Sequence, residues 1–161
     1  MAAPKIILGV DPGLLNTGWG IILKENNTHR FIACGTIITD SKEPMAIRVR
    51  DINLGLSKVL ESHTIDEAAV EETFVNKNSL SSLKLGHARG VILLTLSLAD
   101  IPVSEYSATN VKKSVVGAGR AEKSQVEAMI KVLLPKAIVK TEHEADALAV
   151  AIAHANTHRW G

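Results

Sequence analysis

The chain has 161 residues, of which 46% are hydrophobic and 22% are charged, and its formal net charge is only +1. Such a composition is typical of soluble globular proteins and argues against a disordered chain, while no apolar run approaches the roughly 18 residues of a membrane span. Cys34 is the only cysteine, which excludes a disulfide framework and a thiolate metal cluster. We therefore expect one cytoplasmic domain covering residues 1–161, with no membrane association.

Three strands open the predicted fold. Apolar and β-branched residues fill Ile6 to Val10 and Gly18 to Leu23, and the turn between them begins with the sequence DPG, which is the pattern of a β-hairpin. A third strand is predicted at Arg30 to Thr39, after another short turn. Asp11 stands at the end of the first strand, where its side chain can either cap the turn or project from the edge of the sheet.

Two helices and two further strands follow. Helical spacing of apolar residues predicts a helix from Pro44 to about His63, and the short apolar stretch from Glu67 to Glu72 predicts a buried parallel strand. A long helix from Ser79 to Leu98, capped by Asn78 or Ser79, is apolar nearly all round, so we expect it to be buried on more than one face. Pro102 to Tyr106 is the last predicted strand.

The remainder of the chain is predicted to be helical. Helices are expected at Ala108 to Val116 and around Val126 to Leu133, and Pro135 ends the second of them. Thr141 and Glu144 have the spacing of a capping box and open the final helix, whose many alanines permit a close approach to a sheet.

This order of elements predicts an α/β fold. Its sheet is mixed and five-stranded, with the first three strands antiparallel and with helices on both faces. In such a sheet the first and fourth strands can lie side by side and parallel. Their carboxyl ends then meet, which brings Asp11 and Glu71 together.

The final helix contributes two more polar side chains. His143 and Asp146 are three residues apart, so they share one helix face, near the end where the macrodipole favours an anion. Taken singly, each is better explained as an ordinary surface residue, His143 more so than Asp146. As a set with Asp11 and Glu71, however, they offer hard oxygen ligands to Mg²⁺ or Mn²⁺. Two such ions held about 4 Å apart promote phosphodiester hydrolysis by in-line displacement.

Basic side chains are concentrated in two places, although a solvated protein surface explains them equally well. They are Lys112, Lys113, Arg120 and Lys123 around the glycine-containing turn at 117–119, and Lys77, Lys84 and Arg89 beside the long helix. Phe74 follows Glu71 in a polar segment. It is either a core residue or, if exposed, a surface on which a nucleic-acid base can stack.

Five segments, in order and at matching spacing, resemble the RuvC family, the bacterial Holliday-junction resolvases of the ribonuclease H-like superfamily. They are GVDPGLLNTGWGII, AVEETFVNKN, SLKLGHARGV, VVGAGRAEKSQV and ADALAVAIAHA. The resemblance implies a ribonuclease H-like fold and a bacterial, cytoplasmic endonuclease of homologous recombination and DNA repair. It implies that four-way DNA junctions are cut by paired symmetric nicks through two-metal-ion hydrolysis.

The resemblance also implies site residues and partners. It implies that Asp11, Glu71 and Asp146 bind the metal, and with His143 these are the expected catalytic and metal-binding residues, with two Mg²⁺ ions per site and Mn²⁺ as a substitute. It implies that Lys112 and Lys123 contact DNA and that Phe74 lies near unpaired bases of the junction, and the clustering of basic residues adds Lys77, Lys113 and Arg120 as expected DNA contacts. The helix around 79–98 is expected to form a homodimer, and the branch-migration proteins RuvA and RuvB are implied as partners.

One position departs from part of the family, because His143 stands where many members carry a fourth acid. A nitrogen ligand suits Mn²⁺ better than Mg²⁺. An imidazole with an ordinary pKa of about 6.5 can instead act as a general acid or base near neutral pH. Both roles remain open from the sequence.

Three alternative functions fit the sequence less well. An actin-like or sugar-kinase-like nucleotide-binding domain needs a second lobe, for which 161 residues leave no room. A related nuclease acting on ribosomal RNA precursors is disfavoured by the long apolar helix and the AEKSQV segment. A non-catalytic junction-binding module is disfavoured by the complete set of acids.

Overall fold

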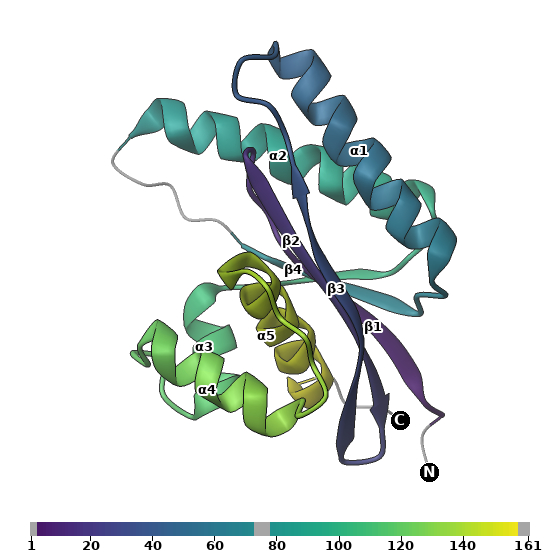
Figure 1. The fold of residues 1–161 in the computed structure, drawn as a ribbon, viewed down its shortest axis with the longest axis vertical. Helices are drawn as coiled ribbons and strands as arrows, with labels where there is room; N and C mark the ends of the chain where they lie inside the picture. The colour runs from purple at the N-terminus through teal and green to yellow at the C-terminus, as the bar shows by residue number, and fades with distance from the viewer. Residues whose placement is uncertain (1–2, 73–77, 158–161) are drawn as a thin grey trace.

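The computed structural model describes residues 3–72 and 78–157. Its strands form a sheet in the order β3-β2-β1-β4-β5, with β1 at the centre (Figure 1). The strands are β1 (Lys5–Asp11), β2 (Asn16–Glu25), β3 (Thr28–Ile38), β4 (Glu67–Glu71) and β5 (Val103–Tyr106).

The connections between the strands explain their directions. Short turns join β1 to β2 and β2 to β3, so both pairs are antiparallel, whereas helical crossovers lead to β4 and β5, so β1 pairs with β4 and β4 with β5 in parallel. The predicted mixed sheet is therefore confirmed, including the parallel pairing of the first and fourth strands. As a result, Asp11 and Glu71 both lie where their strands end, on neighbouring strands.

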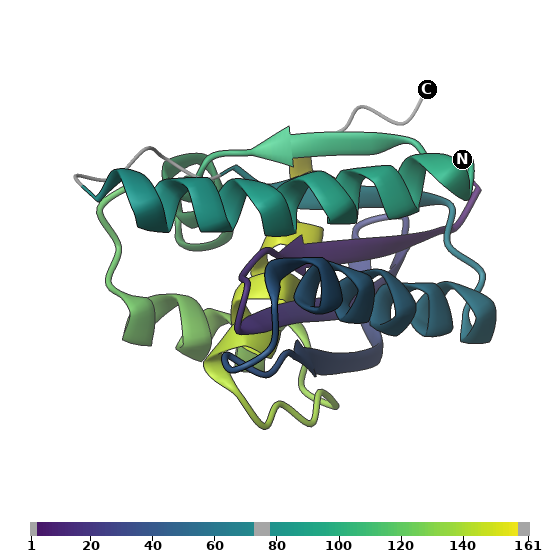
Figure 2. The same cartoon turned by 90° about the horizontal axis from the view of Figure 1, so that it is seen from above.

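Five helices of the described chain cover the two faces of the sheet. They are α1 (Met45–Ser62), α2 (Ser79–Leu98), α3 (Ala108–Val116), α4 (Lys123–Leu133) and α5 (Glu142–Thr157). One core cluster joins the sheet to α1 and α2, and a second joins its other face to α5, α3 and α4. Figure 2 shows α1 and α2 in front of the sheet and α5 behind it. Within the described ranges, no helix has the length and apolarity to cross a membrane.

The central helix α5 lies directly on β1 and β2. A Cβ atom added at Gly9 would overlap the main-chain oxygen of Ala147, and one at Gly18 would overlap that of His143. Only glycine therefore permits this approach. Because Gly18 is the register partner of Asp11, the same contact brings the start of α5 against the end of β1.

Helix starts agree with the sequence in most cases. Asn78 accepts hydrogen bonds from the first turn of α2, and Thr141 and Glu144 form the reciprocal bonds of the predicted capping box. Pro44 was expected inside the first turn of α1 but is its N-cap residue, since its ψ of 154° is extended. The capping box of α4, made by Glu122 and Gln125, was not predicted.

Gly18→Ala should destabilise the protein, because α5 must move away from β2 to accept the new methyl group. We expect a loss of about 1 to 3 kcal/mol in the free energy of unfolding, measured with urea. Gly86→Ala on α2 is the matched control, since nothing lies within 4 Å of its missing side chain. It should leave stability unchanged or raise it by up to about 1 kcal/mol. Equal losses for the two variants would contradict the tight contact.

Candidate active site

Asp11 is held in place by the turn that follows it. The buried hydroxyl of Thr17 donates to the main-chain oxygen of Gly13 at 2.7 Å and accepts from the Gly13 N–H at 3.4 Å. Thr17, rather than Asp11, therefore satisfies the turn. Of the two positions open to Asp11 from the sequence, its carboxylate takes the one that projects from the sheet, where it is 18% exposed.

Asp11 and Glu71 are two largely buried carboxyl groups in contact, which disfavours the simultaneous ionisation of both. Burial raises the pKa of Asp11 well above its ordinary value, and the hydrogen-bonded, like-charged carboxyl group of Glu71 raises it further. Burial also raises the pKa of Glu71. The two groups therefore favour sharing a proton over carrying two negative charges. Such a pair attracts a cation.

Helix α5 supplies the other two polar groups. The Nδ1 atom of His143 lies 3.9 Å from Oδ2 of Asp11. Asp146 sits one turn further on, and burial raises the pKa of its carboxyl group although Lys123 opposes this shift. All four predicted site residues therefore occupy one end of the sheet, where β1, β4 and α5 meet.

Lys123 is the nearest cation to Asp146. Its Nζ atom lies 3.5 Å from Oδ2 of Asp146 and 2.9 Å from Oε2 of Glu142. The hydrogen bond to Glu142, followed by weaker interactions with Asp146, raises the pKa of this lysine. Glu142 is not among the predicted site residues, but its carboxylate binds the lysine that pairs with Asp146.

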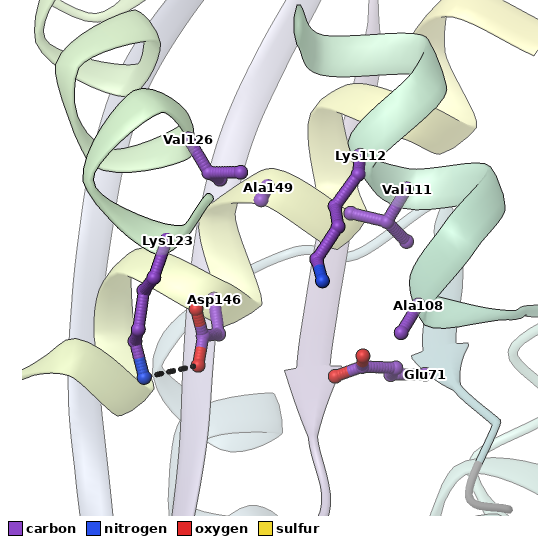
Figure 3. A pocket seen from close by; sticks show the side chains of 8 residues that line it. All are labelled: Glu71, Ala108, Val111, Lys112, Lys123, Val126, Asp146 and Ala149. Atoms are coloured by element: carbon purple, nitrogen blue, oxygen red, sulfur yellow. Dashed lines mark ion pairs between the residues drawn. The ribbon is translucent and has the colours of Figure 1, made fainter. Parts of the chain in front are cut away.

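A pocket of about 230 Å³ opens beside these groups (Figure 3). Glu71 and Asp146 face it from opposite sides, and Lys112 reaches into it from α3. The remaining wall is apolar and comes from α3, α4 and α5, through Ala108, Val111, Val126 and Ala149. Two carboxylates and two ammonium groups thus line a small cavity whose remaining wall is apolar.

The other predicted DNA-binding residues occupy different surroundings. Lys113 and Arg120 are exposed, on α3 and on the turn after it. Phe74 and Lys77 lie outside the described residues. Arg89, counted above among the basic residues beside the long helix, is instead paired with Glu105 of β5.

The donor set was compared with the needs of a divalent metal ion. Across residues 3–72 and 78–157, no group of three His, Cys, Asp or Glu side chains is already arranged to hold one. The chemistry nevertheless fits. Three carboxylates with raised pKa values and one imidazole converge, and hard divalent ions prefer oxygen ligands. An ion at this position would compete with Lys123 for Asp146.

Comparison with known proteins identifies the family of the chain. The model of the family described as crossover junction endodeoxyribonuclease RuvC matches residues 7–154. The chain belongs to the RuvC family. The crossover junction endodeoxyribonuclease RuvC of Azorhizobium caulinodans is 56% identical over 153 residues, covering 95% of this chain and 90% of the relative. That of Methylorubrum populi is 54% identical over 153 residues, covering 95% and 80%.

Solved structures of the family share the fold. The structure described as T. thermophilus RuvC in complex with Holliday junction substrate has a TM-score of 0.87 and 32% identity, covering 94% of this chain and 93% of that chain. The yeast mitochondrial Holliday junction resolvase Ydc2 has a TM-score of 0.66 at 12% identity, covering 93% and 78%. The second likeness is one of fold alone. The ribonuclease H-like fold expected from the RuvC resemblance is confirmed.

Asp11→Asn should stabilise the metal-free protein at neutral pH. Because the pKa of Asp11 is raised on folding, the folded chain binds this proton more tightly than the unfolded chain does. Stability from this group is therefore lost as the pH rises from about 3.9, the ordinary aspartate value, toward the raised pKa. Asparagine removes the repelled charge, so the melting temperature in chelator should rise by about 2 to 4 °C for each kcal/mol recovered.

Asp51→Asn is the control for this measurement. Asp51 is a partly exposed acid that pairs only weakly, at 3.5 Å, with Arg50. Its replacement should change the melting temperature little, since exposed ion pairs contribute about 0 to 1 kcal/mol. If Asp11→Asn were less stable than the unmodified protein, the charge repulsion inferred for the site would be wrong.

Proposed function

We propose that this chain resolves four-way DNA junctions by paired symmetric nicks through metal-dependent phosphodiester hydrolysis. Membership of the RuvC family makes the chain a crossover junction endodeoxyribonuclease. The observation that carries the mechanism is the meeting of Asp11, Glu71 and Asp146 beside a pocket that also holds two lysines. Excess negative charge attracts metal ions there, and the lysines attract phosphate.

Each acid has a distinct place in this mechanism. Asp11 and Glu71 are close enough to share one cation, and Asp146 faces Glu71 across the pocket. When bound, two Mg²⁺ or Mn²⁺ ions would lower the pKa of the attacking water and stabilise the leaving oxygen. His143, close to Asp11, either completes the ligand set or moves a proton at Nδ1.

The lysines serve the substrate. Lys112 projects into the pocket and is placed to contact the phosphate next to the bond that breaks. Lys123 pairs with Asp146 in the metal-free protein. Once a metal ion neutralises that carboxylate, the Lys123 ammonium group would bind a DNA phosphate instead. Lys113 and Arg120 extend this surface, and Phe74 and Lys77 complete the proposed DNA contacts. Contacts of this kind position the backbone without selecting a sequence.

Helix α2 supports the proposal that two copies act together. Its buried side packs on the sheet through Ala88, Ile92, Thr95 and Leu96. The opposite side carries a stripe of four leucines, each more than half exposed, at Leu80, Leu83, Leu94 and Leu98. Solvent-exposed leucine in this number on one helix face is typical of an interface.

The order of residues in the stripe fits a two-fold axis. The stripe is symmetric about a centre between His87 and Gly90. Leu80 and Leu98 occupy its outer positions, and Leu83 and Leu94 its inner positions. A second α2 running antiparallel would place leucine on leucine, as an isologous interface requires. Gly90 has nothing within 4 Å of its missing side chain and would let the two backbones approach closely.

Leu83→Asp should therefore dissociate the dimer. Sedimentation equilibrium should show a rise of at least about 100-fold in the dimer dissociation constant, because each subunit would bury a carboxylate against a leucine of the other. The control is Leu54→Asp, the same change at a half-exposed leucine of α1. If the Leu83→Asp variant remained a dimer, the leucine stripe would not form the interface.

Nicking of a synthetic four-way junction tests the reaction itself. The substrate should be compared with a linear duplex of the same sequence, in Mg²⁺, in Mn²⁺ and in chelator. We expect symmetric nicks on two opposing strands of the junction only, and only with metal. Asp11→Asn should abolish nicking while junction binding in Ca²⁺ persists. Nicks in chelator, or undiminished cutting by Asp11→Asn, would refute the proposal.

The wider assignment follows from the family. A RuvC-type resolvase is expected to act with the branch-migration proteins RuvA and RuvB, and residues 1–161 are proposed to be a single nuclease domain. Co-sedimentation of the chain with RuvA and RuvB on a four-way junction tests the interaction with these two proteins. The two proposals do not depend on each other.

A further inference from the structure

Arg89 lies behind the proposed active site, on the opposite face of the sheet. It belongs to α2, and its side chain is only 19% exposed. The guanidinium group reaches the end of β4, where Nε donates to the main-chain oxygen of Glu71 at 3.4 Å. Nη2 donates to a carboxylate oxygen of Glu105 on β5. One side chain thus connects a helix to the ends of two strands.

The contact involves the backbone of Glu71 and leaves its carboxylate free. Alternate residues of a strand face opposite sides of a sheet. Val70 belongs to the core cluster beneath α1 and α2, whereas Glu71 turns its side chain to the pocket formed by α3, α4 and α5. Arg89 therefore fixes this acid from behind, and the pocket side remains open to a ligand.

The end of β4 is also attached to the neighbouring strand β5. The strand has five residues and ends at Glu71 itself. The next residue, Glu72, donates its N–H to Tyr106 at 2.7 Å. These main-chain bonds hold the backbone of Glu71 on the side of β5, and the contact from Arg89 to the Glu71 carbonyl adds a side-chain restraint at the point where the strand ends.

Arginine suits this position in a way that lysine does not. A planar guanidinium donates in several fixed directions, so it can contact the Glu71 carbonyl and the Glu105 carboxylate at the same time. Glu105 supplies the counter-charge, which prevents the cation from being drawn to the acids of the site. If the pair were only a surface ion pair, it would contribute about 0 to 1 kcal/mol to stability and nothing to the reaction.

We propose that Arg89 is a positioning residue that sets the carboxylate of Glu71 for metal binding, with Glu105 as its counter-ion. The inference rests on the proposed function, in which Glu71 is one of the catalytic acids. Arg89 is also on the side of α2 that lies opposite the leucine stripe. Through this rigid helix, the proposed dimer surface and the end of β4 are held in one unit.

The test uses the full chain with Arg89→Lys, Glu105→Gln and the double variant. Three quantities are measured: Mn²⁺ binding without DNA by calorimetry, junction affinity in Ca²⁺, and the single-turnover nicking rate as a function of Mg²⁺. Arg50→Lys is the matched control, since Arg50 is an exposed arginine of α1 that also pairs with an acid. Thermal melting of each variant reports folding.

Arg89→Lys should weaken Mn²⁺ binding and lower the nicking rate by about 10- to 100-fold, as for residues that support metal ligands. Junction affinity in Ca²⁺ should stay within about twofold, because Arg89 is not part of the DNA surface. Adding Glu105→Gln to Arg89→Lys should have little further effect, since the two residues act through one contact. Arg50→Lys should change none of these values.

Two outcomes would overturn the proposal. If Arg89→Lys melts at a lower temperature but binds Mn²⁺ and nicks as the unmodified protein does, Arg89 is purely structural. If junction affinity falls and Mn²⁺ binding does not, Arg89 contacts DNA. Failure of the unmodified protein to nick any junction would instead contradict the proposed function, and the Mn²⁺ measurement would still report on Arg89.

Discussion

The close contact between α5 and the hairpin of β1 and β2 is the constraint on which the rest of the structure depends. Glycine at positions 9 and 18 removes the side chains that would keep the helix away, and alanines on α5 bury against the strands. Because the contact at Gly18 involves the main chain of His143, the first turn of α5 is fixed relative to Asp11. The same contact therefore determines both the packing of the core and the distances between the acids.

The site is electrostatically unfavourable without a ligand. Burial opposes ionisation of Asp11, Glu71 and Asp146, and the first two also repel each other. A purely structural sheet end would not place acids there, since uncharged residues would cost less. Lys123 offsets part of this cost at Asp146. This charge imbalance favours a bound cation, as the proposed mechanism requires.

Much of the fold could be predicted from the sequence, because the signals are local. Periodicity and turn residues defined the strands and helices, and connection lengths distinguished antiparallel from parallel neighbours. That pairing alone brought Asp11 and Glu71 together. The capping box at Thr141 and Glu144 was also visible, since its two members are three residues apart.

The remaining features depend on contacts between distant segments. Nothing near Arg89 in the sequence indicates that it reaches Glu71 and Glu105 rather than solvent. The choice between Thr17 and Asp11 as the group that satisfies the turn depended on which side chain the neighbouring strand and α5 would bury. The role of Glu142 beside Asp146 is likewise not visible from spacing along α5. Its link to that acid passes through a lysine from another helix.

The three acids come from β1, β4 and α5, that is, from early, middle and late parts of the chain. No single hairpin, helix pair or fragment contains more than two of them. A chain emerging from the ribosome, or one that has lost α5 by proteolysis, therefore lacks the complete site even where its sheet has begun to form. On the proposed mechanism, hydrolytic capacity therefore requires all three parts of the chain to be folded together.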